Sequence, residues 1–321
     1  MRAIQIVELS GPESALKLVD IPEPGGEGVV IDVRAAGVSF PEVLQTRGAY
    51  QVKPELPFVP GSEVAGIVKQ PGHGFDAGDR VAAFPMLGGF AEVAVAPAHF
   101  TFKLPDALDF AQGAGLILNY HTAYFSLVNR GRLRSGETVL VHGAAGGVGT
   151  AAIQVAKGLG ATAYAVVSTD EKEQTAREAG ADEAVLLDGF KGAVQELTGG
   201  RGVDVVLDVV GGDAFTDSLR SLAPQGRLLV VGFASGQGIP EVKVNRLLLN
   251  NVDVRGVGWG AYAMVRPGFM QEQWAELLPM LESGVVKPPI GATYAFEEFG
   301  RALADMDERR TLGKSVVRVR D

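Results

Sequence analysis

The chain has 321 residues, more than most single domains hold, so its length predicts two domains. A formal net charge of -9 argues against nucleic acid or an anionic membrane as the main partner, because phosphate groups are bound by clustered lysine and arginine. Cysteine is absent, which excludes disulfides, a thiol nucleophile and thiolate metal ligands.

The first 120 residues are typical of a small β barrel. Short apolar stretches such as 29–33 and 91–95 are separated by segments rich in glycine and proline, for example 22–26 and 59–61. This pattern predicts a compact domain of short strands joined by many turns.

Predicted strands and helices alternate from about residue 121 to residue 262. The expected strands are 138–142, 164–167, 184–187, 203–210, 227–231 and 252–256, and the expected helices are 146–159 and 171–179. Such alternation predicts a parallel sheet with helices on both faces. Segment 263–321, with expected helices at 272–282 and 297–306 and a strand at 315–319, is predicted to return to the first domain.

The strongest motif is the stretch from Thr138 to Gly149, where a strand leads into glycines and then directly into a helix. That context is the one a dinucleotide-binding fingerprint requires. Gly146 would let the backbone approach a pyrophosphate, and Gly149 would let the helix pack closely on the strand. The first glycine of the fingerprint is replaced by Ala144, so an ordinary turn of small residues is the alternative.

The end of the second strand indicates which nucleotide is bound. An NAD site normally has an acidic residue there, but this strand ends in Ser168 and Thr169, with Lys172 one turn further. A serine hydroxyl and a lysine suit a 2′-phosphate, so we predict NADPH. The alternative is that this segment only caps a helix and that Lys172 is solvated.

Motifs along nearly the whole chain resemble the zinc-independent quinone oxidoreductases of the medium-chain dehydrogenase/reductase superfamily. The matching segments are 36–40, 57–66, 78–81, 119–124, 144–149 and 313–314. The resemblance implies an α/β fold in which a GroES-like β-barrel domain flanks a Rossmann doubly wound parallel sheet. It also implies a homodimer, for which the strand around 252–256 is the expected paired edge.

The resemblance also implies which residues bind the cofactor. They fall on the pyrophosphate turn, at the 2′-phosphate or near the nicotinamide, and are Gly146, Gly147, Val148, Ser168, Lys172, Thr122, Phe233, Gly258, Trp259 and Lys314. Asp188 stands where many family members carry a tyrosine near the adenine, and its charge would repel a 2′-phosphate.

Zinc-dependent relatives carry a cysteine and a histidine where this chain has Ser39 and Ser62. A neutral hydroxyl is a poor zinc ligand beside thiolate and imidazole, so we predict no metal. Glu63 invites interpretation as a general base, but a role in capping backbone groups inside the barrel is favoured. His121 is a candidate proton shuttle, with a hydrogen-bonded helix residue as the favoured alternative.

Without a metal, a conjugated acceptor is the suitable substrate, because charge from hydride transfer delocalises onto its oxygen. We therefore predict an NADPH-dependent quinone oxidoreductase. The candidate catalytic residues are Tyr50 and Tyr124, which can donate a hydrogen bond or stack on a flat ring, and Ser39, which can bond the substrate or a ribose. Either tyrosine is equally compatible with simple packing.

Two alternatives remain open. One is reduction of 2-alkenals, enones or 2-enoyl thioesters, for which the arginines at 130, 132 and 134 would offer a basic patch, although a solvated loop is the simpler interpretation. The other is an NADPH-binding sensor or structural protein with little turnover. No stretch is apolar enough for a membrane helix and the first residues lack the apolar core of a signal peptide, so we expect a cytoplasmic protein that binds neither membrane nor nucleic acid.

Overall fold

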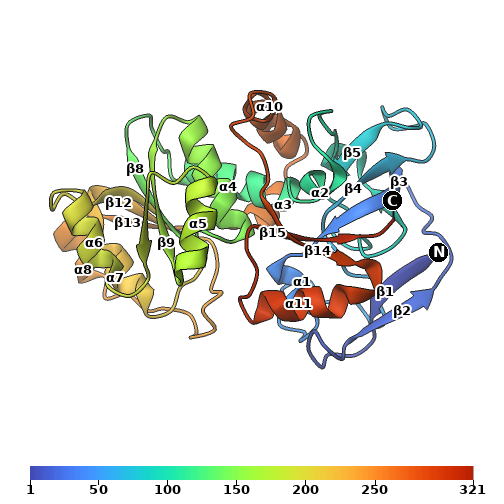
Figure 1. The fold of residues 1–321 in the computed structure, drawn as a ribbon, viewed down its shortest axis with the longest axis horizontal. Coiled ribbons are helices and arrows are strands. Elements are labelled where there is room, and N and C mark those ends of the chain that lie inside the picture. Colours follow the sequence, from blue (N-terminus) through green and yellow to red (C-terminus); the bar gives the residue numbers. More distant parts are fainter. Residues whose placement is uncertain (321) are drawn as a thin grey trace. The chain divides into compact units, whose positions relative to one another are not determined.

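The computed structural model describes residues 1–320 and divides into two compact units (Figure 1). The first unit contains residues 1–118 together with residues from 288 onward, and the second contains Asn119–Lys287. Segment 263–287, expected to return to the first domain, instead groups with the second. The reason is that helix α10 (Phe269–Glu282) is tied to the second unit through Gln273, which accepts a hydrogen bond from the Trp259 indole at 2.9 Å and donates one to the His121 carbonyl at 3.3 Å.

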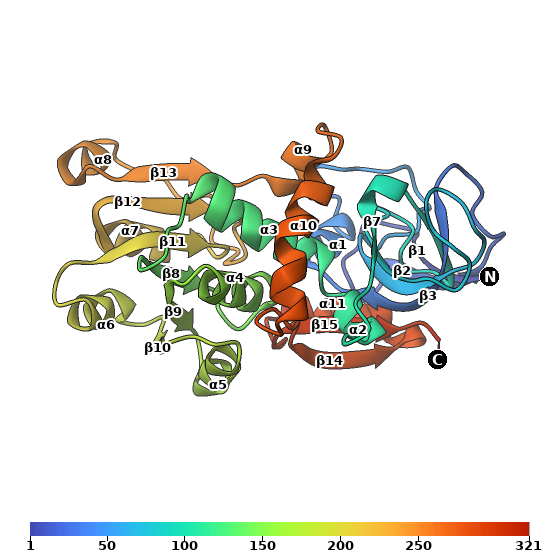
Figure 2. The same ribbon diagram turned by 90° about the horizontal axis from the view of Figure 1, so that it is seen from above.

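The second unit is built on a six-stranded sheet in the order β10-β9-β8-β11-β12-β13, which Figure 2 shows in one column. Every pairing between neighbouring strands is parallel. The strands are β8 (Thr138–His142), β9 (Thr162–Val167), β10 (Glu183–Leu186), β11 (Val203–Asp208), β12 (Leu222–Val230) and β13 (Asp253–Gly256). The predicted parallel sheet is therefore confirmed.

Helices cover both faces of this sheet, with α4 and α5 on one side and α6 and α7 on the other (Figure 1). Because both faces are covered, the central strand β11 is buried along its whole length. The helices are α3 (Ile117–Tyr124, with a π-helical continuation Phe125–Arg130), α4 (Gly147–Gly158), α5 (Asp170–Glu178), α6 (Phe190–Leu197), α7 (Ala214–Arg220), α8 (Asn245–Asn250), α9 (Trp259–Ala263) and α10. Helix α3 begins in the last residues of the first unit.

The first unit contains a seven-stranded sheet and a separate two-stranded sheet of β1 (Arg2–Ile6) and β2 (Leu16–Asp20). The larger sheet has the order β14-β15-β3-β4-β5-β7, with β6 paired to β3. Its strands are β3 (Val29–Gly37), β4 (Val64–Val68), β5 (Arg80–Ala83), β6 (Val93–Ala96), β7 (Thr101–Lys103), β14 (Ile290–Ala295) and β15 (Lys314–Arg318).

Short helices complete the first unit. They are α1 (Phe40–Gln45), α2 (Phe110–Gly113) and α11 (Phe299–Asp307), with 3-10 turns at Ala98–Phe100 and Phe296–Glu298. Helix α11 closes the core, where Phe299 stacks on Phe90 with ring centroids 3.8 Å apart. Among residues 1–320, no helix combines the length and the apolarity needed to cross a membrane.

Candidate functional site

The turn between β8 and α4 has the shape expected of a phosphate-binding turn. Gly143 adopts a positive φ of 61°, which lets the chain leave the strand sharply. A Cβ atom on Gly149 would lie 2.2 Å from the carbonyl oxygen of Gly143, so only glycine allows the helix to pack this closely on the strand. The role predicted for Gly149 is thus supported by the packing.

The glycine at the start of α4 is not required by the packing of the chain itself. Gly146 is the N-cap of the helix, and a Cβ atom there would meet only one atom, the Gly143 oxygen at 3.4 Å. Gly146, Gly147 and Val148 all keep part of their surface exposed, whereas Gly149 is buried. The first turn is therefore accessible, and the backbone N–H groups of a first helical turn have no partner within the helix, as a bound phosphate needs.

Ser168 and Lys172 lie together at the end of β9. The Lys172 Nζ donates to the Ser168 Oγ at 3.0 Å, and Ser168 is exposed. Thr169 caps α5 by accepting a hydrogen bond from the Lys172 backbone N–H at 3.4 Å. Thr169 therefore caps the helix while Ser168 and Lys172 remain together as candidates for binding a phosphate. Asp188, which follows β10, is exposed.

Two other candidates, Thr122 and Tyr124, lie on α3 and are each 8% exposed. The Thr122 carbonyl accepts a hydrogen bond from the Ser126 hydroxyl at 2.6 Å. Burial raises the pKa of the Tyr124 hydroxyl, and the charge of Glu276 raises it further, so this phenol remains a donor at neutral pH.

Phe233, Gly258 and Trp259 follow the carboxyl ends of β12 and β13. Phe233 is 40% exposed, whereas Trp259 is only 3% exposed. Gly258 is the N-cap of α9. The Trp259 indole N–H donates to the Gln273 Oε1 at 2.9 Å, so this side chain fills the interior of the second unit. Phe233 is therefore the more accessible aromatic of the two.

His121 is fully buried in the second unit. Its ring centroid lies 5.8 Å from that of Trp259 and 6.2 Å from that of Trp274. These aromatic neighbours favour a role in packing for His121 over a role as a proton shuttle.

The arginine-rich loop at 130–134 is tied to its own unit. The Arg130 side chain donates to the Gly256 carbonyl at 2.8 Å. The Arg227 guanidinium donates to the carbonyls of Gly131, at 2.8 Å, and Arg132, at 3.1 Å. These hydrogen bonds hold the loop against its own unit, which favours a structural role for it.

In the first unit, strand pairing brings together three residues that are far apart in the sequence: Ser39, Glu63 and Lys314. Ser39 follows the end of β3, Glu63 precedes β4 and Lys314 begins β15. Because β4 and β15 both pair antiparallel with β3, from opposite sides, their first residues meet the end of β3.

The three side chains form a buried charged cluster. The Lys314 Nζ donates to the Ser39 Oγ at 2.7 Å and forms an ion pair with the Glu63 Oε1. The Ser39 hydroxyl contacts the same Glu63 oxygen at 3.2 Å. The second Glu63 oxygen accepts the backbone N–H of Leu118 at 3.0 Å, as a capping role predicts. Lys314 is thus engaged within the first unit.

Sequence reasoning missed Glu42, which joins Ser39 to Ser62. The Glu42 Oε1 accepts the Ser62 backbone N–H at 2.9 Å and the Ser62 hydroxyl at 2.6 Å. The other oxygen accepts the Ser39 N–H at 3.0 Å. The spacing Ser39-x-x-Glu42 is that of a helix capping box, a signal that could have identified this residue.

Burial controls the acidity of Glu42 and Tyr50. Burial raises the pKa of Glu42 above its usual value, opposed by the Ser62 hydrogen bond and by the charge of Lys314. Burial also raises the pKa of the half-buried Tyr50, and the charge of Glu42 adds to that effect. Tyr50 therefore remains a protonated donor at neutral pH.

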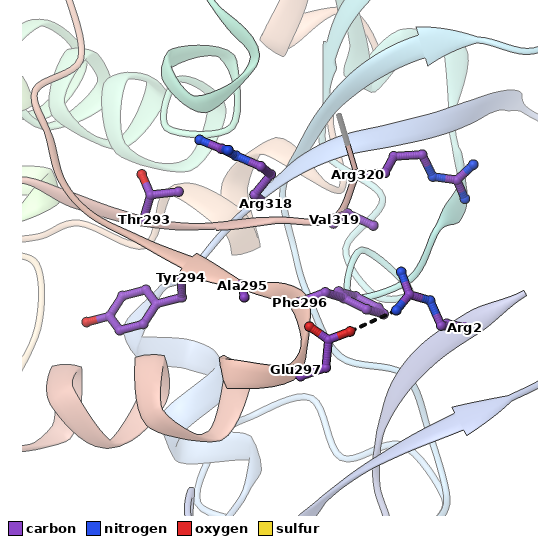
Figure 3. Close-up of a pocket in the computed structure, with 9 residues that line it drawn as sticks. All are labelled: Arg2, Thr293, Tyr294, Ala295, Phe296, Glu297, Arg318, Val319 and Arg320. Atoms are coloured by element: carbon purple, nitrogen blue, oxygen red, sulfur yellow. Dashed lines mark hydrogen bonds and ion pairs between the residues drawn. The ribbon is translucent and has the colours of Figure 1, made fainter.

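A surface cavity of about 390 Å³ lies elsewhere in the first unit, along β14 and β15 (Figure 3). Arg2 and Glu297 form an ion pair at its wall, 2.8 Å apart, and none of the predicted site residues lines it. Arg320, also in its wall, pairs with Asp32 at 2.9 Å. Arg2 and Arg320 are therefore both paired with carboxylates.

No group of three or more histidine or acidic side chains capable of holding a metal occurs within the part of the chain that the structure describes. Of the positions corresponding to zinc ligands in related dehydrogenases, Ser62 donates to Glu42 and Ser39 accepts from Lys314. Both hydroxyls therefore have protein partners.

Comparison with known proteins matches both units. Residues 25–106 match the family described as alcohol dehydrogenase GroES-like domain, and residues 147–283 match the family described as zinc-binding dehydrogenase. The chain is 37% identical over 319 residues to "Quinone oxidoreductase-like protein 2" of Bos taurus, which covers 98% of this chain and 91% of that protein.

Two solved structures share the whole fold. A probable oxidoreductase from Mycobacterium abscessus is 45% identical, with a TM-score of 0.90 and coverage of 99% of each chain. The quinone oxidoreductase of Thermus thermophilus, solved also in complex with NADPH, is 34% identical, with a TM-score of 0.86 and coverage of 99% of this chain and 100% of that one.

Proposed function

We propose that this chain, which belongs to the quinone oxidoreductase-like family of the medium-chain dehydrogenase/reductase superfamily, reduces a quinone with NADPH and without zinc. The predicted fold, a GroES-like domain and a Rossmann-type parallel sheet, is confirmed by the family matches and by the structural neighbours. The observation that carries the proposed activity is the similarity over nearly the full chain to a quinone oxidoreductase-like protein and to a quinone oxidoreductase that was also solved with NADPH.

The residues of the second unit fit NADPH. The first turn of α4 is open at Gly146, and Lys172 and Ser168 replace the carboxylate that an NAD site would place at the end of β9. We propose that Gly146, Gly147 and Val148 bind the pyrophosphate and that Ser168 and Lys172 bind the 2′-phosphate. The remaining proposed cofactor residues are Thr122, Phe233, Gly258 and Trp259. Lys314, which the resemblance also implies near the cofactor, has its ammonium bound by Ser39 and Glu63, so we propose that it acts through those two residues.

Zinc-free chemistry is proposed from the side chains themselves. Ser39 and Ser62 offer neutral hydroxyls where a zinc site needs thiolate or imidazole. A metal ion bound by Ser39 would have to displace its hydrogen bond with Lys314, and one bound by Ser62 would have to displace its hydrogen bond with Glu42.

A conjugated acceptor needs no Lewis acid, because the negative charge that develops can spread to an oxygen. When bound, NADPH supplies the hydride. The chain would supply donors for that oxygen, and Ser39, Tyr50 and Tyr124 are the proposed ones. Both tyrosines have a raised pKa and so keep the phenolic proton.

The first test follows oxidation of NADPH and of NADH with 1,4-benzoquinone, 1,4-naphthoquinone and 9,10-phenanthrenequinone, in wild type and Lys172→Ala. A lost charge-assisted hydrogen bond should raise the KM for NADPH roughly 10- to 100-fold and leave the KM for NADH nearly unchanged. Lys191→Ala is the matched control, because Lys191 is a lysine of the same unit that pairs with Asp217. Equal effects of the two variants would contradict the 2′-phosphate assignment.

The same assay separates the alternatives. Turnover confined to an alkenal or to crotonyl-CoA would identify an enone or enoyl-thioester reductase. Tight NADPH binding without turnover of any acceptor would favour a sensor or structural protein.

We also propose a homodimer that forms through the edge of the second unit. Strand β13 is the last strand of its sheet. Four apolar side chains on the preceding segment are strongly exposed: Ile239 at 76%, Val244 at 73%, Leu248 at 76% and Leu249 at 73%. An open strand edge beside exposed apolar residues is typical of a surface that pairs with a second copy.

A further inference from the structure

The Ser39 hydroxyl accepts a strong hydrogen bond but donates only a weak one. A serine hydroxyl has one proton and two lone pairs. Lys314 occupies a lone pair at 2.7 Å, a strong hydrogen bond from a charged donor. The proton of Ser39 has only the Glu63 oxygen at 3.2 Å, which is long for a bond between two oxygens.

Glu63 does not depend on that proton for its pairing. Its Oε1 already accepts the Lys314 ammonium and its Oε2 accepts the Leu118 N–H at 3.0 Å. The Ser39 proton can therefore turn to a better acceptor, such as an oxygen that carries negative charge, without leaving Glu63 unpaired.

Burial makes the Lys314 charge effective at Ser39. Lys314 is 3% exposed and Glu63 is fully buried, so water screens this ion pair little. Ser39, at 5%, is the most exposed of the three. Of the three side chains, Ser39 alone combines some exposure with a proton held by a long hydrogen bond, so it is the donor that a ligand oxygen would use.

We propose that Lys314 acts on the reaction through Ser39, polarising its hydroxyl so that it donates a charge-assisted hydrogen bond to the substrate oxygen that becomes negative. The ligand class is a phenolate or enolate oxygen, the form that a quinone or enone takes after accepting hydride. Ser39 is then the catalytic residue, Lys314 is a positioning residue and Glu63 is its counterion. This inference rests on the proposed function, because that function supplies the oxygen anion.

The fixed position of Lys314 supports an indirect role. Lys314 begins β15, where its backbone N–H donates to the Pro289 carbonyl at 2.8 Å. The preceding Gly313 has φ of 57°, and a Cβ atom there would lie 2.5 Å from the same carbonyl oxygen. These contacts fix the backbone from which the Lys314 side chain reaches Ser39 and Glu63.

The test measures binding of 4-nitrophenolate, a stable phenolate with a visible absorption band, to the full chain loaded with NADP⁺. Ser39→Ala and Lys314→Met should each raise its dissociation constant roughly tenfold. The double variant Ser39→Ala/Lys314→Met should bind the phenolate no more weakly than the weaker-binding single variant, because each change removes the same interaction. Additive losses, an unaffected Lys314→Met or no binding by wild type would each overturn the inference.

Lys314→Met leaves Glu63 buried without its cation and can fail to fold. The variant Lys314→Met/Glu63→Gln removes both charges, and it too should lose about tenfold in phenolate affinity. Wild-type affinity in this folded double variant would overturn the inference.

Turnover assays on the same proteins keep this inference separate from the proposed function. Phenolate binding that depends on Ser39 and Lys314, without turnover of any conjugated carbonyl, supports the oxygen site and contradicts the reductase. Quinone turnover at a wild-type rate in Lys314→Met contradicts the inference and leaves the reductase standing.

Discussion

His142 ends β8 and is fully buried. Its Nε2 lies 2.8 Å from the Ser218 hydroxyl, and its ring meets Phe190 edge-on. Burial lowers the pKa of His142 below its usual value, with Asp208 opposing the shift. The histidine is therefore neutral in the folded protein at neutral pH, and this makes stability dependent on pH.

We expect this residue to weaken the fold in acid. Below about pH 6.5 the unfolded chain binds a proton at this position while the folded chain resists it, so stability falls as pH falls. His142→Gln should unfold more easily than wild type at pH 7, by about 1 kcal/mol for the altered bond to Ser218, yet lose less stability between pH 7 and pH 5. Urea unfolding at both pH values checks this, with the exposed His73→Gln as control.

Alanine substitutions at two glycines of the β8–α4 turn should have opposite effects on stability and on NADPH binding. Gly149→Ala should destabilise the protein by about 1–3 kcal/mol, because its Cβ would overlap the Gly143 carbonyl. Gly146→Ala has room for its Cβ and should leave the melting temperature nearly unchanged while weakening NADPH binding. Thermal melting and NADPH titration check the pair. Normal NADPH affinity in Gly146→Ala would contradict the pyrophosphate assignment.

At the scale of elements, Gln154 of α4 joins helix α3 to the end of the second unit. Its Oε1 accepts the Tyr120 hydroxyl at 2.7 Å and the Lys287 N–H at 2.9 Å, and its amide donates to the Lys287 carbonyl at 2.9 Å. One side chain thus binds residues that lie at both boundaries of the unit.

Gln154→Leu should destabilise the second unit by about 2–4 kcal/mol, because it leaves three polar groups without their partner. Both tryptophans of the chain, Trp259 and Trp274, lie in this unit, so their fluorescence during urea unfolding reports on it directly. The exposed Gln195→Leu on α6 is the control and should change stability by less than about 0.5 kcal/mol. Equal midpoints for the two variants would refute the structural role.

At the scale of the whole molecule, the proposed dimer predicts the effect of added charge. Leu248→Glu/Leu249→Glu should convert a dimer to a monomer, because charged groups cannot be buried there without partners. Light scattering after size exclusion gives the mass directly. Leu18→Glu, on strand β2 at 45% exposure, is the control and should leave the mass unchanged. A monomeric wild type would disprove the dimer.

Part of the local geometry of the candidate site could be predicted because its signals lie in neighbouring residues. The motif from Thr138 to Gly149 can be recognised in a continuous stretch of sequence, since strand, glycines and helix follow one another directly. Ser168 and Lys172 are four residues apart and meet within one helical turn. The side chain of Trp259, by contrast, proved to be buried against Gln273, because its environment is set by a helix further along the chain.

The sequence by itself determined the parallel sheet and the glycine-rich turn that follows its first strand, because periodicity and glycine positions are properties of short segments. Only the tertiary structure decided that residues 263–287 belong to the second unit and that Lys314 lies behind Ser39. Ser39 and Lys314 are separated by 275 positions, and their contact depends on two antiparallel pairings with β3. Pairing between strands so far apart in the sequence is fixed by the packing of the whole unit.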